Sequence, residues 1–134
     1  MPAPGHLDHV VAGGEPEPLK RRLQGERLAV KAGGRIFFLR SDQIDWVESV
    51  GNHVRLHVGK ETHLLRETLG RLEQRLPGEK FLRIHRGAMI NVDRIKEIQP
   101  WFHGDYVVVL TTGARITSGR SYRERLRGFV DRLT

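Results

Sequence analysis

The chain has no cysteine, few aromatic residues and no long hydrophobic run, and these absences exclude several classes of protein. Without cysteine there is no disulfide framework, no thiolate nucleophile and no cysteine-type zinc site. Residues 1–19 lack an apolar core behind a basic start, so they do not read as a secretion signal. No later apolar run approaches the length of a membrane span. We therefore expect a cytoplasmic protein.

The common enzyme motifs are also absent. The sequence contains no G-x-G-x-x-G, no G-x-x-x-x-G-K-[ST], no H-E-x-x-H and no G-x-S-x-G. Seven histidines raise the question of a metal site. We expect His57 and His63 to face each other across the polar side of a hairpin, but only Glu61 could join them, and structural sites need four ligands. The expectation is no catalysis, no metal and no cofactor.

The charge of the chain is strongly positive. Its net charge is +7 and its pI is about 10.5, which indicates a polyanionic partner. Residues 1–24 hold three basic and three acidic side chains, so the excess lies in the 20 basic and 13 acidic residues that follow. A basic surface that only keeps the protein in solution would have the same composition, so charge by itself does not name nucleic acid.

The residue pattern changes near residue 25. Proline and glycine punctuate residues 1–24 without a sustained hydrophobic period, which is typical of a flexible linker or a disordered arm. Residues 25–134 are expected to form one domain. Short runs within it predict β-strands at 27–31, 35–40, 44–50, 53–58, 61–65, 81–84, 88–92, 94–99, 106–111 and 114–118.

Two helices are expected within this β background. Leucines at helical spacing predict the first over 66–76, where Pro77 and Gly78 end it. The second follows Ser121, whose spacing from Glu124 is that of a capping box, and carries an apolar stripe over 126–133. The expected fold is mostly β, with small antiparallel sheets of about nine to ten short strands and two short peripheral helices.

Two finer expectations concern the arrangement of the strands. Residues 35–40 are apolar on both faces, which favours a central strand. If Thr62 and Leu64 share a face with Leu56, then the connection between the two strands is the three-residue segment 59–61 rather than a two-residue turn.

Three predicted loops share one character. Each has a long or bidentate hydrogen-bonding side chain beside a glycine, which lets the backbone turn sharply and present the side chain outward. Asparagine, histidine and arginine can reach base edges, and arginine matches O6 and N7 of guanine. The loops are Asn52-His53 after Gly51, His85-Arg86 before Gly87, and Arg120 after Gly119.

Each of these residues also has a purely structural interpretation. Asn52 could occupy a left-handed turn position, and His85 could be a buried histidine bonded to the backbone. Surface ion pairs are the alternative for the two arginines: Arg86 with Asp93 or Glu97, and Arg120 with Glu124. Taken singly, no loop identifies a function.

Taken together and in order, the segments resemble the LytTR domain, the DNA-binding output module of LytR/AlgR-type response regulators. The resemblance runs from about Arg27 to Leu133 and is carried by IDWVESVGNHVRLHV, HLLRETLGRLEQRL, FLRIHRGAMINVDRI and WFHGDYVVVLTTGARITSGRSYRERL. It implies small antiparallel sheets with minor helices. It also implies that double-stranded DNA is bound through loops rather than through a recognition helix.

The resemblance places the DNA-reading positions on His53 (with Asn52 beside it), Arg86 and Arg120. The first and last loops would enter successive major grooves, and the middle loop would approach the minor groove and backbone between them. We predict base readout by His53, Asn52 and Arg120, and a minor-groove or phosphate contact by Arg86. Further phosphate contacts are predicted for Lys60, Arg66, Arg94, Arg123 and Arg125.

The resemblance also implies partners. Two protomers would occupy paired direct repeats, and an upstream receiver or sensor domain of a two-component system is expected, which 24 residues cannot hold. The sequence fits both an excised output domain and a stand-alone regulator. The alternative from another class is a protein-interaction module whose basic surface docks an acidic partner domain. RNA binding is a third interpretation, but no strand is rich in aromatic side chains for stacking bases.

Overall fold

The computed structural model describes residues 27–134, so the predicted arm over 1–24 lies outside the described residues. Residues 27–134 form ten strands and two α-helices, which confirms the predicted mostly-β class. The helices are α3 (Leu69–Arg75) and α4 (Arg123–Leu133). The strands are β1 (Arg27–Ala32), β2 (Arg35–Arg40), β3 (Trp46–Val50), β4 (His53–Val58), β5 (Glu61–Leu65), β6 (Phe81–His85), β7 (Ala88–Asn91), β8 (Ile95–Pro100), β9 (Tyr106–Leu110) and β10 (Arg115–Thr117).

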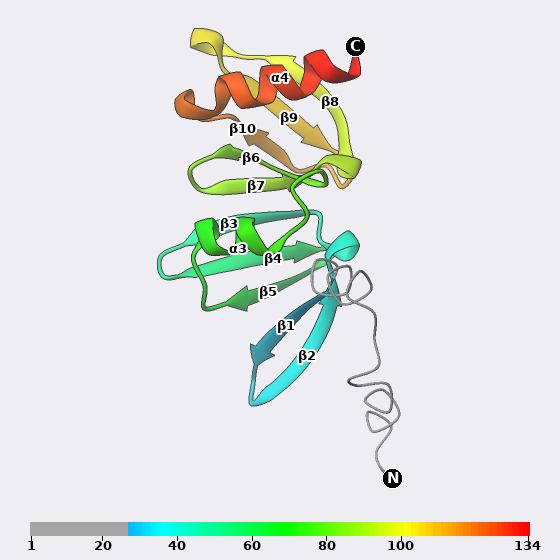
Figure 1. The fold of residues 1–134 in the computed structure, drawn as a ribbon, viewed down its shortest axis with the longest axis vertical. Helices are drawn as coiled ribbons and strands as arrows, with labels where there is room; N and C mark the ends of the chain where they lie inside the picture. Colours follow the sequence, from blue (N-terminus) through cyan, green and yellow to red (C-terminus); the bar gives the residue numbers. More distant parts are fainter. Residues whose placement is uncertain (1–26) are drawn as a thin grey trace.

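The strands form three antiparallel sheets that follow one another along the long axis of the molecule (Figure 1). β1 and β2 pair at one end, and a sheet of order β10-β9-β8 lies at the other end together with α4. Between them lies a five-stranded sheet of order β5-β4-β3-β7-β6. Neither helix within residues 27–134 is long and apolar enough to cross a membrane.

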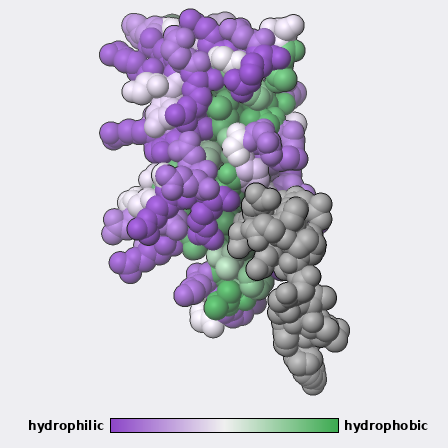
Figure 2. All heavy atoms as spheres, in the orientation of Figure 1, coloured by the Kyte–Doolittle hydropathy of each residue, from purple (hydrophilic) through white to green (hydrophobic). Residues whose placement is uncertain are grey.

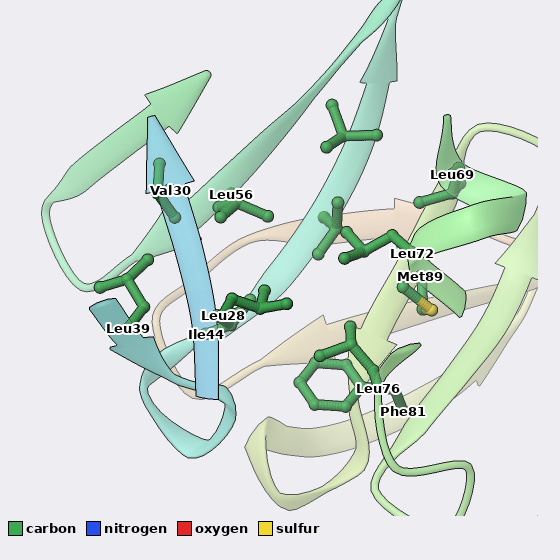
Figure 3. Close-up of a cluster of buried hydrophobic side chains, with 12 residues drawn as sticks. Leu28, Val30, Leu39, Ile44, Leu56, Leu69, Leu72, Leu76, Phe81 and Met89 are labelled. Atoms are coloured by element: carbon green, nitrogen blue, oxygen red, sulfur yellow. The ribbon is translucent and has the colours of Figure 1, made fainter. Parts of the chain in front are cut away.

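A first hydrophobic core lies between the β1–β2 hairpin, α3 and one face of the five-stranded sheet (Figure 3). Alternation along β4 produces this face, because Val54 and Leu56 are fully buried while Arg55 and His57 face the other way. Leu72 of α3 packs into the same cluster with no exposed surface. The helix is therefore held to the sheet by its apolar side.

A second core joins the five-stranded sheet to the three-stranded sheet and α4. Ile84 and Ile90 contribute from β6 and β7, Val108 from β9, and Leu126 from α4, and all four are fully buried. β6 and β7 thus connect the two ends of the molecule. Their hairpin turn is fixed between elements that come from distant parts of the sequence.

The prediction that residues 35–40 form a central strand is wrong. β2 pairs with β1 in a two-stranded sheet, and its side chains Ile36 and Phe38 are each 59% exposed. One face of β2 packs on the core through Leu39, while the other stays on the surface. The guanidinium of Arg27 lies 4.8 Å from the centre of the Phe38 ring, so a cation–π contact partly covers this aromatic side chain.

The prediction of a three-residue connection between β4 and β5 is also wrong. Val58 pairs with Glu61, so Gly59 and Lys60 form a two-residue turn. Gly59 has a φ of 60°, a left-handed conformation that favours glycine in such tight turns. As a result Leu64 lies on the outer face of the sheet, where it is 48% exposed.

This register also separates the two histidines that were expected to face each other. His57 pairs with Thr62, whereas His63 pairs with Leu56, so they lie on opposite faces. The ring of His57 stacks on the ring of Trp46 with 4.2 Å between their centres, and the ring centres of His63 and Phe37 lie 5.1 Å apart. No group of three or more metal-ligating side chains occurs within residues 27–134.

The helices differ from expectation at their beginnings. α3 begins at Leu69, where the Thr68 hydroxyl accepts from the Arg71 amide at 3.2 Å. The predicted capping box at Ser121 is wrong, because Ser121 lies inside a 3-10 turn (Arg120–Tyr122) that leads into α4. Ser121 and Glu124 have the spacing of a capping box, but Ser121 is part of the 3-10 turn, and the residue before α4 is Tyr122.

Candidate nucleic-acid interface

Three connections of the fold lie in a row along one long edge of the molecule (Figure 1). Backbone hydrogen bonds hold two of them to neighbouring strands: the Ser49 amide of β3 donates to the Gly87 carbonyl at 2.9 Å, and the Gly119 amide donates to the Ile84 carbonyl of β6 at 2.8 Å. We call this row the loop edge. It consists of the β3–β4 turn (51–53), the β6–β7 turn (85–87) and the β10–α4 segment (118–121).

In the β3–β4 turn, Gly51 has the left-handed conformation, with a φ of 61°. Among the described residues the only non-glycine with a positive φ is His103, so the left-handed interpretation of Asn52 is wrong. Asn52 is exposed, and His53 begins β4 opposite Val50 with its side chain half-buried. The glycine makes the turn and leaves the next two side chains at the loop edge.

In the β6–β7 turn, Arg86 is exposed and makes no ion pair within residues 27–134. Asp93, one of its suggested partners, lies 3.8 Å from Lys80 instead. His85 is half-buried, and its Nδ1 accepts from the Gly87 amide at 3.0 Å. The structural interpretation of His85 is therefore correct in its backbone hydrogen bond but not in full burial. The histidine holds the turn in which Arg86 is exposed.

The β10–α4 segment is anchored before it reaches Arg120. Ser118 is buried, and its hydroxyl accepts from the Tyr106 amide at 3.0 Å. Gly119 packs so closely on His85 that an added Cβ would lie 3.1 Å from the ring carbon Cδ2. Arg120 follows, exposed and without an ion pair in the described part of the chain, since Glu124 lies 3.7 Å from Arg127.

The predicted phosphate-binding residues fall into separate groups. Arg66 follows Leu65, the last residue of β5, which pairs with Val54. Arg66 therefore lies near the loop edge, and its side chain is exposed. Lys60 lies in the turn at the opposite end of the five-stranded sheet. Arg94 is near that end too, where its Nε donates to Asp45 at 2.7 Å. The structure does not bring Lys60 and Arg94 together with the three turns.

The two predicted residues on α4 have acidic partners. Arg123 donates to Asp105 at 2.8 Å, which ties the first turn of the helix to the β8–β9 connection. Arg125 donates to Glu73 of α3 at 3.0 Å, and its guanidinium lies 5.1 Å from the centre of the Tyr122 ring. Both arginines therefore hold elements together around the start of α4.

Sequence reasoning missed Arg83, which lies on β6 just below the β6–β7 turn. One of its terminal nitrogens donates to the Arg86 carbonyl at 2.6 Å, and the other donates to Glu73 at 3.2 Å. Its position inside a strand, with no neighbouring glycine, gave no signal of a link to the loops. Its partners lie ten residues upstream and three residues downstream, so only the fold reveals the contact.

The loop edge carries no acidic side chain in its three segments, and hydrophilic side chains project along it in Figure 2. Glu48 lies on β3, which leads into the β3–β4 turn, and its charge is compensated within the sheet. Its Oε1 accepts from Arg55 at 2.9 Å and lies 2.8 Å from Nε2 of His57. Burial raises the pKa of Glu48, but hydrogen bonds with His57 and Arg55 outweigh it and hold the pKa below its ordinary value.

The chain matches known proteins over most of its described length. The model of the LytTr DNA-binding domain matches residues 34–131. "Sensory transduction protein LytT" of Bacillus subtilis (strain 168) is 31% identical over 101 residues, which cover 75% of this chain and 42% of that protein. "Transcriptional regulatory protein LytR" of Staphylococcus aureus (strain N315) is 32% identical over 108 residues, 81% of this chain and 44% of that protein. The chain thus spans less than half the length of these relatives.

A solved structure has the same fold. It is described as "LytTr DNA-binding domain of putative methyl-accepting/DNA response regulator from Bacillus cereus", and it matches with a TM-score of 0.72 at 22% sequence identity, covering 78% of this chain and 96% of that chain. The residues matched by the family, 34–131, include all three segments of the loop edge. The chain therefore belongs to the LytTR family, which is a family of DNA-binding domains and not of enzymes.

Proposed function

We propose that this chain binds double-stranded DNA sequence-specifically through the loop edge, as the output domain of a transcription regulator of the two-component type. The observation that supports this most is that Asn52, Arg86 and Arg120 are all exposed on one edge, on turns anchored by hydrogen bonds. The two arginines form no ion pair within residues 27–134, so a ligand does not have to break one to reach them. Their chemistry suits base edges and phosphate oxygens.

The residues take different roles in this proposal. Asn52 and His53 in the first turn, and Arg120 in the last, read bases in successive major grooves. Arg86, in the middle turn, contacts the minor groove or the phosphates between them. A row of turns along one edge fits this assignment, because DNA lying along that edge meets the three turns in sequence.

Phosphate contacts are proposed for exposed cations near the same edge. Arg66 is the favoured residue because it is exposed beside β4 and has no acidic partner among the described residues. Arg123 and Arg125 already pair with Asp105 and Glu73, so their contribution to phosphate binding is smaller. Lys60 and Arg94 are left out of the proposed interface because they lie at the opposite end of the sheet.

The regulatory setting is proposed from the relatives. Their names describe sensory transduction and transcriptional regulation, and this chain matches less than half of each. We propose that a receiver or sensor domain supplies the input, that the protein acts in the cytoplasm, and that two protomers occupy paired direct repeats.

The proposal predicts a specific effect of Arg120→Ala. Arg120 lies between the anchored Gly119 and the start of α4, so its backbone is already ordered before it binds one guanine with two hydrogen bonds. We expect the substitution to cost about 1–3 kcal/mol of binding free energy on a cognate duplex and to relax the preference at one base pair per half-site. Arg120→Lys should not restore the affinity fully, because an ammonium lacks the planar guanidinium.

Arg132→Ala is the matched control, since Arg132 is an exposed arginine in the last turn of α4. Binding of each variant to cognate and random duplexes is measured by fluorescence anisotropy. If Arg120→Ala weakens binding to both duplexes equally, Arg120 contacts phosphate only and the base-readout role is wrong.

A further inference from the structure

Arg83 has the contacts of a side chain that fixes the direction of a loop. It lies on β6, two residues before the end of the strand, and its side chain is only 17% exposed. Its Nη2 donates to the carbonyl of Arg86 at 2.6 Å, and its Nη1 donates to Glu73 of α3 at 3.2 Å. The guanidinium therefore connects the peptide group of Arg86 to a helix that is packed in the first core.

The same contacts extend to the last segment of the loop edge. The guanidinium of Arg83 lies 5.6 Å from the centre of the Tyr122 ring, two residues after Arg120, and Arg125 lies 5.1 Å from that ring. Glu73 accepts from Arg83 through one oxygen and from Arg125 through the other, at 3.2 and 3.0 Å. One carboxylate and one ring thus join β6, α3 and the start of α4.

The burial of Arg83 costs free energy of folding, which favours a function for this side chain in its buried position. Its Nε is buried and has no hydrogen-bond partner among the residues that the structure describes. An unmet donor on a charged side chain is unfavourable, and a surface arginine would avoid this cost.

We propose that Arg83 is a positioning residue for DNA readout: it does not contact DNA but holds the backbone of Arg86, and thereby the direction of the Arg86 side chain, against α3 and Tyr122. This inference rests on the proposed function of the loop edge. Lysine cannot replace arginine here, because one ammonium on a flexible stem cannot hold the Arg86 carbonyl, Glu73 and the Tyr122 ring in a single geometry.

The test compares Arg83→Lys with Arg75→Lys, which makes the same change at an exposed arginine of α3. The probe is a duplex selected from a random library by the wild-type chain. We expect Arg83→Lys to weaken binding to this duplex about tenfold, as the loss of one charge-assisted hydrogen bond implies. Binding to random duplex should weaken by a smaller factor if Arg86 reads the minor groove, and by the same factor if Arg86 contacts phosphate. Arg75→Lys should change neither.

A double variant separates positioning from direct contact. In the Arg86→Ala background the oriented side chain is gone, so Arg83→Lys should have almost no further effect on cognate affinity. Hydrogen exchange of the Gly87 amide, measured by NMR without DNA, should also become faster in Arg83→Lys and stay unchanged in Arg75→Lys. Full additivity of the two substitutions, or unchanged exchange at Gly87, overturns the positioning role.

The outcomes distinguish the two proposals. If Arg86→Ala and Arg120→Ala weaken cognate binding while Arg83→Lys does not, the loop edge binds DNA and only the role of Arg83 is wrong. If the library yields no enriched duplex, the proposed function fails and the positioning role falls with it, even where Gly87 exchange responds to Arg83→Lys.

Discussion

The affinity of the domain for duplex DNA is expected to fall about 150-fold when monovalent salt rises from about 50 mM to about 200 mM. Each neutralised phosphate contributes a slope of about −0.9 to the plot of log affinity against log salt, and about four phosphates per protomer give this fall. The net charge of +7, carried by residues 25–134, makes four such contacts a modest expectation. The measurement is a salt titration of the dissociation constant.

Two single lysine or arginine variants locate the phosphate contacts. Arg66→Ala, near the loop edge, should reduce the magnitude of the slope by about 0.9. Lys60→Ala removes the same charge at the opposite end of the five-stranded sheet and should leave the slope unchanged. An affinity that barely changes with salt contradicts a DNA surface, and equal effects of the two variants contradict its placement on the loop edge.

Leu72→Ala is expected to lower the free energy of unfolding by about 2–5 kcal/mol. Leu72 has no exposed surface and packs in the first core, so its removal leaves a cavity between α3 and the sheet. The same helix holds Glu73, the partner of Arg83 and Arg125. Urea denaturation followed by circular dichroism measures the change.

Two controls keep stability apart from DNA binding. Leu133→Ala, at a side chain that is 73% exposed, should change the free energy of unfolding by less than about 0.5 kcal/mol. Arg86→Ala should behave in the same way while weakening DNA binding. If Arg86→Ala unfolds at a much lower urea concentration than the wild type, Arg86 has a structural role and is removed from the proposed interface.

Most strands could be predicted because their apolar and polar residues alternate over short runs. The alternation in β4 and the glycines at Gly51 and Gly59 mark its ends in the sequence as they do in the structure. What alternation does not determine is which strands pair and in what register. The single-residue difference at the β4–β5 turn placed Leu64 on the outer face instead of the inner one.

The exposure of β2 could not be read from its composition. Residues 35–40 are apolar on both faces, but the two-stranded sheet has only one face to pack on the core. A cation–π contact between Arg27 and Phe38 partly covers the other face, and such a contact depends on pairing between β1 and β2. The composition of a strand gives the number of its apolar residues, but not which of its two faces another element covers.

The candidate site was predictable where residue type and a neighbouring glycine coincide, as at Arg86 and Arg120. Its supports were not, because they depend on contacts between distant segments. Gly119 packs on His85, and Glu73 reaches both Arg83 and Arg125. The same limit applies to Lys60 and Arg94, whose charge suggested phosphate binding before the fold placed them at the other end of the sheet.

Selection from a random duplex library tests the central claim most directly. The wild-type chain is compared with a variant in which Asn52, Arg86 and Arg120 are all replaced by alanine, after circular dichroism has shown that both are folded. The loop edge predicts that the wild type enriches a sequence motif arranged as a direct repeat, and that the triple variant enriches none. Enrichment of the same motif by both proteins contradicts the loop edge as the reading surface. No enrichment by the wild type contradicts specific DNA binding and favours a module that docks an acidic partner domain.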